Sequence, residues 1–214
     1  MQVEIWADVV CPWCYLGTRH FEQALERFPH RDDVEVIHRS FELDPFAPPG
    51  VTTPTVERLA SKYGLGLEQA REAQRQMEER AAQAGLTFRM ADLRSGNTRD
   101  AHRLLQLATA RGRQAEMAER LYRAYFTDQA SIFDHASLAG FAADAGLDRD
   151  EALAVLAGDE YSRAVDADEE VARSFGVSGV PFFVIDHRYG ISGAQPAETI
   201  AAVLERVWAE TAAA

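Results

Sequence analysis

The feature that most constrains the fold is a pair of cysteines at a strand-to-helix junction. Cys11-Pro12-Trp13-Cys14 follows the apolar segment 3–7 and opens a stretch with helical spacing of apolar residues that ends at Pro29. Pro12 takes the first helical position, where its missing N–H costs no hydrogen bond. The free N–H groups and the dipole of a helix N-terminus stabilise a thiolate, which makes it nucleophilic near neutral pH. The two thiols are also close enough to form a disulfide.

The spacing of apolar residues changes twice along the chain. Residues 3–7 and 34–41 read as strands on either side of the first helix, which predicts a β-α-β unit. After a proline-rich linker at 45–50, helical periodicity alone runs from Thr53 to about Phe175. Within it, a charged helix is expected from Leu67 to Ala84.

Strand character returns near the C-terminal end. Residues 180–185 are apolar and β-prone, residues 186–190 are expected to turn, a strand begins at Ile191, and Pro196 opens a final helix that ends near Trp208. Both ends of the chain are needed to complete one sheet. We therefore expect residues 1–43 and 177–214 to form a discontinuous α/β domain and residues 44–176 to form an inserted helical domain.

Three polar residues are expected to cap helices of the helical block. Asn97 is followed by Asp100 at the third helical position, and Asp134 and Asp148 precede further helical stretches. Their side-chain oxygens can accept hydrogen bonds from the first free N–H groups of a helix.

Charge and composition exclude several classes of function. Acidic side chains outnumber basic ones by 34 to 22, which gives a net charge of −12 and no attraction for nucleic acid or an anionic membrane. The first six residues carry no basic n-region, and no apolar run is long enough to span a bilayer. We therefore expect a cytoplasmic protein without a nucleic-acid or membrane partner. No metal site is predicted, because zinc needs four ligands and no second Cys-x-x-Cys pair or ordered His pair is present.

The chain resembles the DsbA family of thioredoxin-fold oxidoreductases with its helical insertion, and most closely the FrnE-like branch. The segments that carry the resemblance are Asp8–Cys14, Phe41–Pro45, Asn97–Leu104, Gly176–Phe183 and Ser192–Pro196. They stand in the family's order. The resemblance implies a thioredoxin-like fold with a central mixed sheet and a large all-helical insertion. It also implies a cis-proline at Pro181, which would leave the backbone of Val180 free to pair with an extended substrate.

The same resemblance implies thiol–disulfide oxidoreductase or isomerase chemistry. Cys11 would be the nucleophile and Cys14 the resolving thiol, while Pro12 and Trp13 would tune and shape the site. The redox-active disulfide would be the only redox group, and glutathione is a candidate reductant. The substrate would be a protein or a small molecule that carries a thiol or a disulfide.

Other side chains near these motifs have two interpretations each. Asp8, Asn97 and His102 are candidates for the substrate groove. His102 is either a substrate-facing residue that relays protons or a packed residue of its helix. Asp8 is either an acid near the active site or a turn residue, and Trp13 is either a substrate platform or an apolar lid.

Two other functions compete with the oxidoreductase. Kappa-type glutathione transferases and 2-hydroxychromene-2-carboxylate isomerases share the fold and the insertion, but they use a serine at the position of Cys11. Their glutathione-binding Ser-Asp-Arg near the last helix is replaced here by residues that include Ala194 and Gln195. The second alternative is a chaperone-like binding module whose thiols only sense the redox state.

Overall fold

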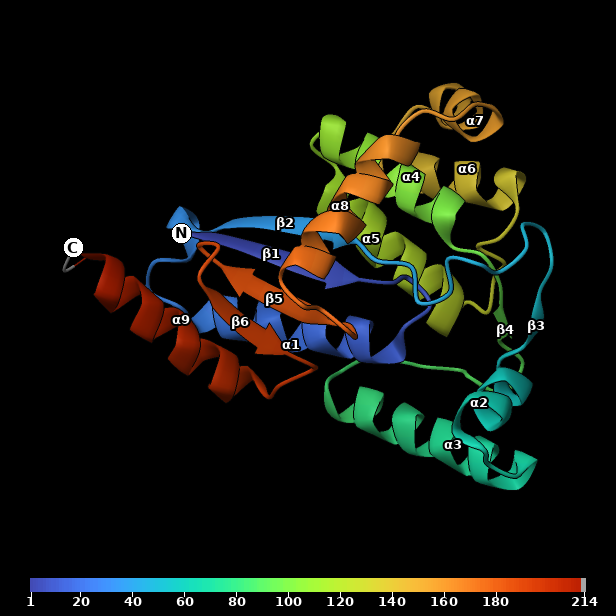
Figure 1. Cartoon of the computed structure of the whole chain (residues 1–214), viewed down its shortest axis with the longest axis horizontal. Coiled ribbons are helices and arrows are strands. Elements are labelled where there is room, and N and C mark those ends of the chain that lie inside the picture. Colours follow the sequence, from blue (N-terminus) through green and yellow to red (C-terminus); the bar gives the residue numbers. More distant parts are fainter. Residues whose placement is uncertain (213–214) are drawn as a thin grey trace.

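The structure is a computed structural model that describes residues 1–212 (Figure 1). The strands are β1 (Gln2–Ala7), β2 (Glu35–Ser40), β3 (Thr53–Pro54), β4 (Arg94–Ser95), β5 (Phe182–Ile185) and β6 (Tyr189–Ser192). The α-helices are α1 (Pro12–Arg27), α2 (Thr55–Tyr63), α3 (Leu67–Gln83), α4 (Arg99–Ala110), α5 (Gln114–Tyr122), α6 (His135–Asp144), α7 (Arg149–Ala157), α8 (Ser162–Ser174) and α9 (Ala197–Ala212). One 3₁₀ turn spans Arg31–Asp33, and a π-helical segment, Arg123–Thr127, continues α5.

The main sheet is mixed and joins the two ends of the chain. Its order is β2-β1-β5-β6, with β1 parallel to β2 and antiparallel to β5, and with β5 antiparallel to β6. This confirms the predicted thioredoxin-like fold with a mixed sheet. β6 begins at Tyr189, two residues before the predicted start. The reason is a short turn in which Asp186 and His187 take left-handed conformations, with φ of 48° and 55°.

The two faces of the sheet are covered by different helices (Figure 1). Because side chains alternate along a strand, Val3 and Ile5 of β1 join Phe183 of β5 in an apolar cluster with α1 and α9. Trp6 and Val184 point to the opposite face, where α8 covers them. The strands are therefore buried on both sides, which fixes the end of β1 where the cysteines follow.

A buried carboxylate attaches α8 to the edge of the sheet. Asp168 accepts a hydrogen bond from the backbone N–H of Ser40 at 2.8 Å, and its backbone carbonyl accepts one from the indole N–H of Trp6 at 2.9 Å. The guanidinium of Arg39 lies 3.1 Å from the same carboxylate. These contacts hold α8 against β2 and the segment that follows it.

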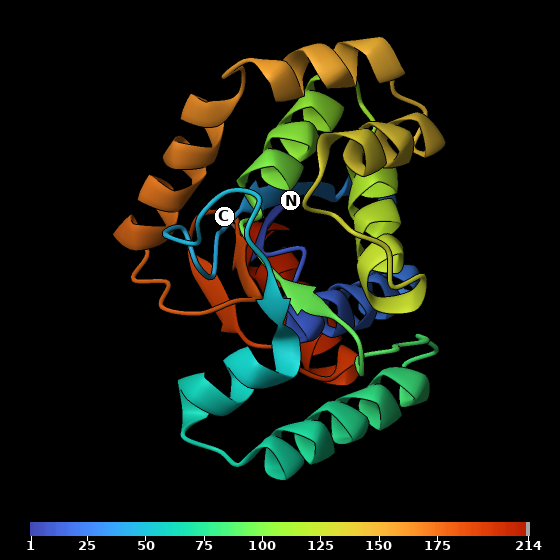
Figure 2. The same ribbon diagram turned by 90° about the vertical axis from the view of Figure 1, so that its right-hand side faces the viewer.

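Helices are the main regular structure between β2 and β5, as predicted, with loops and two short strands between them. The α2–α3 hairpin lies on one side of the molecule, and α4–α8 lie on the other (Figures 1 and 2). The sequence analysis missed β3 and β4. They pair over only two residues each and are too short to show the alternation of apolar and polar residues that marks a strand. The apolar core of the helical part also contains Cys11 and Cys14, so the dithiol lies where sheet and helices meet.

The helix caps follow the prediction at two of three sites. The side chains of Asp134 and Asp148 accept from the N–H groups of Ser137 and Glu151, which confirms both as N-caps. The third prediction was wrong by one residue, since Thr98 is the N-cap of α4. Asn97 instead accepts from the N–H of Arg99 at 2.9 Å and donates to the carbonyl of Ala47 at 2.9 Å, so it joins the linker to the start of α4.

The last helix is longer than the sequence indicated. It continues to Ala212 rather than ending near Trp208. None of the helices within residues 1–212 has the length and apolar character needed to cross a lipid bilayer.

Candidate active site

The two cysteines occupy the first turn of α1. Cys11 is the N-cap, with an extended backbone at φ −90° and ψ 112°, and Pro12 follows at the first helical position. The carbonyl of Cys11 accepts hydrogen bonds from the N–H groups of Cys14 at 3.0 Å and Tyr15 at 3.3 Å. Both thiols are free. Cys11 keeps 5% of its surface exposed whereas Cys14 has none, so a substrate can reach only the first sulfur.

The environment of Cys14 favours the protonated thiol. Burial raises the pKa of Cys14 well above its ordinary value, and the hydrogen bond and charge of Cys11 raise it further. A backbone hydrogen bond from Asp8 lowers it and the Asp8 charge raises it. Cys14 therefore holds its proton at neutral pH and must lose it before it can attack another sulfur.

The loop before β5 lies against Cys11. The Val180–Pro181 peptide bond is cis, and the Cys11 thiol lies 3.7 Å from the carbonyl oxygen of Val180, within reach of an S–H···O hydrogen bond. The carbonyl of Pro181 accepts from the N–H of Gly193 at 2.9 Å, which links the loop to the segment after β6. Residues from both ends of the chain thus meet at one sulfur.

Gly17 is a site residue that the sequence analysis missed. A Cβ at this position of α1 would lie 2.8 Å from Cγ of Pro181 and 3.3 Å from Cα of Ala194. Only glycine lets α1 approach the Pro181 loop this closely. The available signal was a glycine in the interior of an otherwise regular helix, where it costs about 1 kcal/mol relative to alanine and needs a packing reason.

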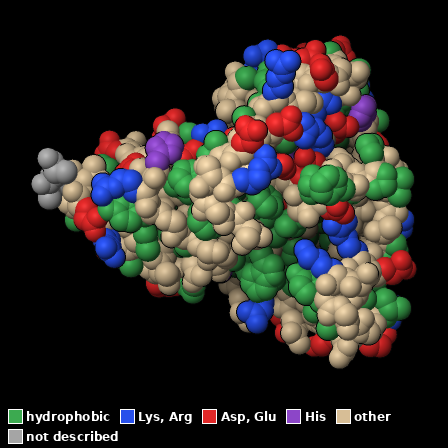
Figure 3. Space-filling model, in the orientation of Figure 1, with side chains coloured by type: hydrophobic (Ala, Val, Ile, Leu, Met, Phe, Trp, Pro, Cys, Tyr) green, Lys and Arg blue, Asp and Glu red, His purple; other side chains and the backbone are tan. Residues whose placement is uncertain are grey.

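A groove of about 380 Å³ opens beside Cys11. Its walls are the dithiol loop, the α2 helix, the Ser95–Gly96 segment and the loop before Pro181; the lining residues are Asp8, Val10, Cys11, Pro12, Trp13, Leu43, Asp44, Thr55, Arg58, Leu59, Lys62, Tyr63, Ser95, Gly96, Ser178, Gly179 and Val180. Figure 3 shows hydrophobic and basic side chains around the hollow between the α2–α3 hairpin and the rest of the molecule. This volume lies in the range of small-molecule sites.

A second hollow continues the groove beyond Trp13. It measures about 300 Å³, shares Pro12, Trp13, Leu59 and Tyr63 with the groove, and extends to Met77 of α3. The Trp13 side chain, 44% exposed, forms the wall between the two hollows, with the guanidinium of Arg80 5.7 Å from its ring centre. Trp13 thus lies at the edge of the groove, between the two hollows.

Basic side chains on α2 face the groove and were also missed. Arg58 and Lys62 line it, although Arg58 is paired with Asp44 at 2.6 Å. No local signal marks them, because their position depends on how the α2–α3 hairpin folds back over the dithiol.

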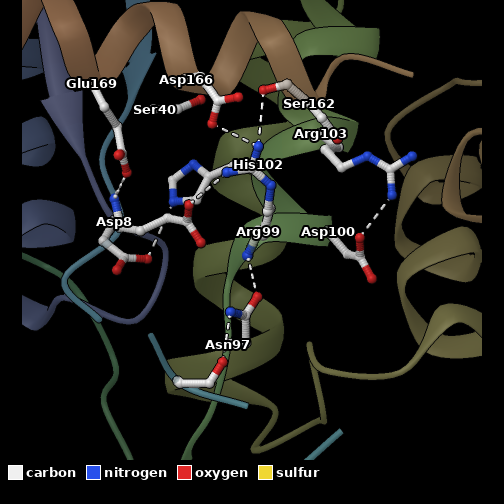
Figure 4. A network of polar contacts seen from close by, with 12 residues as sticks. Asp8, Ser40, Asn97, Arg99, Asp100, His102, Arg103, Ser162, Asp166 and Glu169 are labelled. Atoms are coloured by element: carbon white, nitrogen blue, oxygen red, sulfur yellow. Dashed lines mark hydrogen bonds and ion pairs between the residues drawn. The ribbon is translucent and has the colours of Figure 1, made fainter. Parts of the chain in front are cut away.

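The three candidate groove residues take three different places. Asp8 lines the groove although only 1% of its surface is exposed. His102 is fully buried behind Asp8, with Nε2 3.3 Å from Oδ1 of Asp8 (Figure 4). Of the two interpretations of His102, the structure agrees with a packed residue of its helix, because α4 turns this side chain inward. Asn97 follows the groove-lining Gly96 in the chain, but both polar atoms of its side chain form hydrogen bonds with backbone groups.

Two stacked aromatic side chains lie beneath the site. Tyr122 stacks on Tyr15 with ring centres 4.7 Å apart, and both rings are almost fully buried. They support the first turn of α1 and do not line the groove. Within residues 1–212, no group of three or more His, Cys, Asp or Glu side chains is arranged to bind a metal ion.

A mixed sheet with a dithiol at the N-terminus of its first helix defines the class of thioredoxin-fold proteins. The chain belongs to the family of DSBA-like thioredoxin domains, whose pattern matches residues 2–205. Among curated proteins, no sequence matches the chain significantly.

Solved structures agree with this assignment. The chain is similar to a probable DsbA oxidoreductase from Streptomyces coelicolor, with 48% identity over 98% of this chain and 91% of that one, and a TM-score of 0.95. It shares its fold with a 2-hydroxychromene-2-carboxylate isomerase (15% identity, 99% and 98% covered, TM-score 0.73). It also shares it with the cytosolic disulfide reductase DsbM from Pseudomonas aeruginosa, solved with glutathione (17% identity, 97% and 99% covered, TM-score 0.67).

Proposed function

We propose that the chain is a thiol–disulfide oxidoreductase in which Cys11 attacks and Cys14 resolves. The observation that carries the proposal is the unequal placement of the two thiols. Cys11 lines the groove at a helix N-terminus, next to the Val180 carbonyl, whereas Cys14 lies one turn deeper and is fully buried. This asymmetry matches a two-step exchange, in which one sulfur meets the substrate and the other closes the disulfide.

In the reducing direction, the Cys11 thiolate attacks one sulfur of a substrate disulfide. The substrate S–S bond breaks, a mixed disulfide forms on Cys11, and the first substrate sulfur leaves as a thiolate. Cys14 then loses its proton and attacks Cys11. The mixed disulfide breaks, the second substrate sulfur leaves, and two electrons have passed from the dithiol to the substrate. The oxidising direction is the reverse of these steps.

The groove is suited to an extended peptide segment or to a small disulfide. Val180 presents its backbone beside Cys11, and Pro12 and Trp13 shape the wall on the other side. We propose that the disulfide is the only redox group, that glutathione serves as a reductant, and that the protein works in the cytoplasm as a FrnE-like member of its family. The family membership, the groove and the similarity to DsbM support this combination.

The experiment is a trapping assay with the full chain. Cys14→Ala is expected to accumulate a mixed disulfide on Cys11 with 5,5′-dithiobis(2-nitrobenzoic acid) and with scrambled ribonuclease, detected by mass spectrometry. Cys11→Ser is expected to form no adduct and to lose insulin reduction entirely, because the buried Cys14 cannot reach the substrate. An adduct on Cys14, or full activity in Cys11→Ser, would contradict the proposal.

The same variants separate the two competing functions. A glutathione-dependent isomerase would retain catalysis in Cys14→Ala and bind glutathione tightly. A chaperone-like module would suppress aggregation equally well in the wild type and in both variants. The oxidoreductase predicts neither result.

A further inference from the structure

The hollow beyond Trp13 takes no part in the exchange between the two cysteines. It measures about 300 Å³ and is lined by Pro12 and Trp13 of the dithiol loop and by residues of the α2–α3 hairpin, among them Met77 and Arg80. Neither cysteine lines it. The hollow shares Pro12 and Trp13 with the groove in which Cys11 lies. A molecule that is bonded to Cys11 can therefore extend across Trp13 into this hollow.

Much of the wall of this hollow is apolar. Leu59 and Tyr63 come from α2, Met77 comes from α3, and Leu65 and Met90 come from the loops on either side of α3. Tyr63 is 62% exposed, so part of this apolar surface is open to water. Covering such surface with an apolar group of a ligand is favourable, because it removes both apolar surfaces from water. The wall therefore suits an aliphatic or aromatic group.

Three long polar side chains of α3 line the hollow, and two of them are already bonded within the protein. The amide of Gln74 donates to a backbone carbonyl at 3.2 Å, and the amide of Gln76 donates to a glutamate of the same helix at 3.1 Å. Arg80 is the third. Within residues 1–212 its guanidinium forms no hydrogen bond and no ion pair, and it lies 5.7 Å from the centre of the Trp13 ring. Arg80 is thus the cation of this wall that is open to a ligand.

Arg80 differs in this respect from two other arginines of α3. Arg71 and Arg75 each form an ion pair with the glutamate three residues earlier, on the exposed side of the helix. The residue three positions before Arg80 is Met77, which is buried in the core and offers no charge. The helix therefore pairs these two outward arginines and leaves Arg80, beside its buried face, without an acid. In a chain with a net charge of −12, an unpaired cation in a hollow favours an anionic ligand.

We propose that this hollow binds the outer end of a small disulfide substrate, in which the sulfur carries an apolar chain that ends in a carboxylate. The inference rests on the proposed function and names its substrate class. Cys11 attacks the disulfide, one half stays on Cys11 as a mixed disulfide, and the other half leaves as a thiolate. The apolar chain of the bound half crosses Trp13 and covers Met77, and its carboxylate accepts hydrogen bonds from the guanidinium of Arg80. Cys14 then displaces the bound half as its thiolate, and two electrons have passed to the substrate.

Chain length separates this subsite from the basic residues of the groove. Arg58 and Lys62 line the groove together with Cys11, whereas Arg80 lines the hollow beyond Trp13 and not the groove. A carboxylate close to the sulfur can meet the first two cations without crossing Trp13. A carboxylate meets Arg80 only at the end of a longer chain. A preference for the carboxylate that needs both the long chain and Arg80 is therefore specific to the proposed subsite.

Equilibrium thiol–disulfide exchange on the full chain with Cys14→Ala measures this preference, because Cys11 is then the only cysteine. The protein is mixed with equal concentrations of 6,6′-dithiodihexanoic acid and bis(6-hydroxyhexyl) disulfide under excess 2-mercaptoethanol. Intact-mass spectrometry gives the ratio of the carboxylate adduct to the hydroxyl adduct. The same ratio on the chain unfolded in urea is the reference without a site. The folded chain should favour the carboxylate adduct about fivefold over this reference, as for a partly exposed ion pair.

Substitutions in this background assign the preference to one residue. Arg80→Gln should return the ratio to the reference value, and Arg80→Glu should bring it below that value. Arg75→Gln is the matched control, because it removes the same charge from the same helix and Arg75 does not line the hollow. It should leave the ratio unchanged. With the short pair, 3,3′-dithiodipropionic acid and bis(3-hydroxypropyl) disulfide, Arg80→Gln should have no effect on the ratio.

Two results would overturn the inference. One is a long-chain ratio in folded Cys14→Ala that equals the reference value. The other is a preference for the long-chain carboxylate that persists in Arg80→Gln, which would assign the recognition to the basic residues of the groove. If folded Cys14→Ala formed no adduct on Cys11 with either pair, the proposed function itself would fail. The two failures are therefore distinguishable, because the first concerns the ratio of the adducts and the second concerns their formation.

Discussion

Two interfaces of α4 each hold a histidine, half-buried His38 and fully buried His102, and the two environments shift the pKa of the imidazole in opposite directions. At the interface with the sheet, His38 of β2 lies among Ala7, Leu105 and Ala118, and burial alone lowers its pKa to about 4. At the interface with the dithiol loop, His102 lies among carboxylates that raise its pKa despite burial.

The opposite pKa shifts of His38 and His102 show how differently the two interfaces are built. Burial disfavours a charge at both sites, so the nature of the neighbours decides the outcome. At the sheet interface burial is the cause of the shift, and Gln114 of α5 holds β2: its side chain accepts a hydrogen bond from the N–H of His38 at 3.0 Å and donates one to the carbonyl of His38 at 2.8 Å. The dithiol interface places a buried histidine among several acids, whose charges raise its pKa.

The largest effect is expected from His102→Leu. This change leaves the buried Asp8 carboxylate without its imidazole partner, so the free energy of unfolding should fall by about 3–5 kcal/mol near pH 6.5. The loss should shrink at pH 4.5, because burial raises the pKa of the neighbouring Glu42, which then takes up a proton. It should also shrink above the raised pKa of His102, where the wild type itself loses the interaction. Urea unfolding at several pH values measures this, and a loss independent of pH would contradict a charged His102.

His38→Leu should have the opposite sign. Between pH 6.5 and about 4 the unfolded chain binds a proton at His38 that the folded chain does not, so wild-type stability falls as the pH falls. Leucine removes this penalty. The variant should gain about 1–2 kcal/mol relative to the wild type on going from pH 7 to pH 4.5, after allowance for partial exposure of the ring. An unchanged difference between the two pH values would show that His38 is not a buried neutral imidazole.

The smallest effect is expected from Gln114→Ala. It removes two neutral hydrogen bonds to β2 and should cost about 1–2 kcal/mol. Because no charge is involved, the cost should be the same at pH 5 and pH 7.5 in urea unfolding. A pH-dependent cost would mean that the sheet interface is not neutral and would weaken the contrast with the dithiol interface.

Much of the fold could be predicted because its signals are local. The Cys11–Cys14 motif, the strand before it and the proline at 181 each mark a short segment, and alternation along β1 and β5 gives the buried sheet. The places of His102 and Gly17 could not be derived in this way. The place of His102 depends on its contact with Asp8, which lies 94 residues away in the sequence. The need for glycine at position 17 depends on contact with Pro181 and Ala194, near the other end of the chain.

The N-cap of α4 and the basic residues of the groove also could not be predicted from local sequence, because both depend on tertiary contacts. Asn97 has the right side chain for an N-cap, but the contact with Ala47 holds it outside the helix, so the cap moves to Thr98. Arg58 and Lys62 lie on an ordinary-looking charged helix, and only the fold of the α2–α3 hairpin places them beside Cys11.

The most direct test of the account is the protonation state of His38 and His102. Nitrogen-15 NMR of the imidazoles in the full reduced chain at pH 7, assigned with His102→Gln and His38→Leu, distinguishes imidazolium from neutral imidazole. The account predicts that His102 carries protons on both ring nitrogens and that His38 is neutral. A neutral His102 at pH 7 would contradict it.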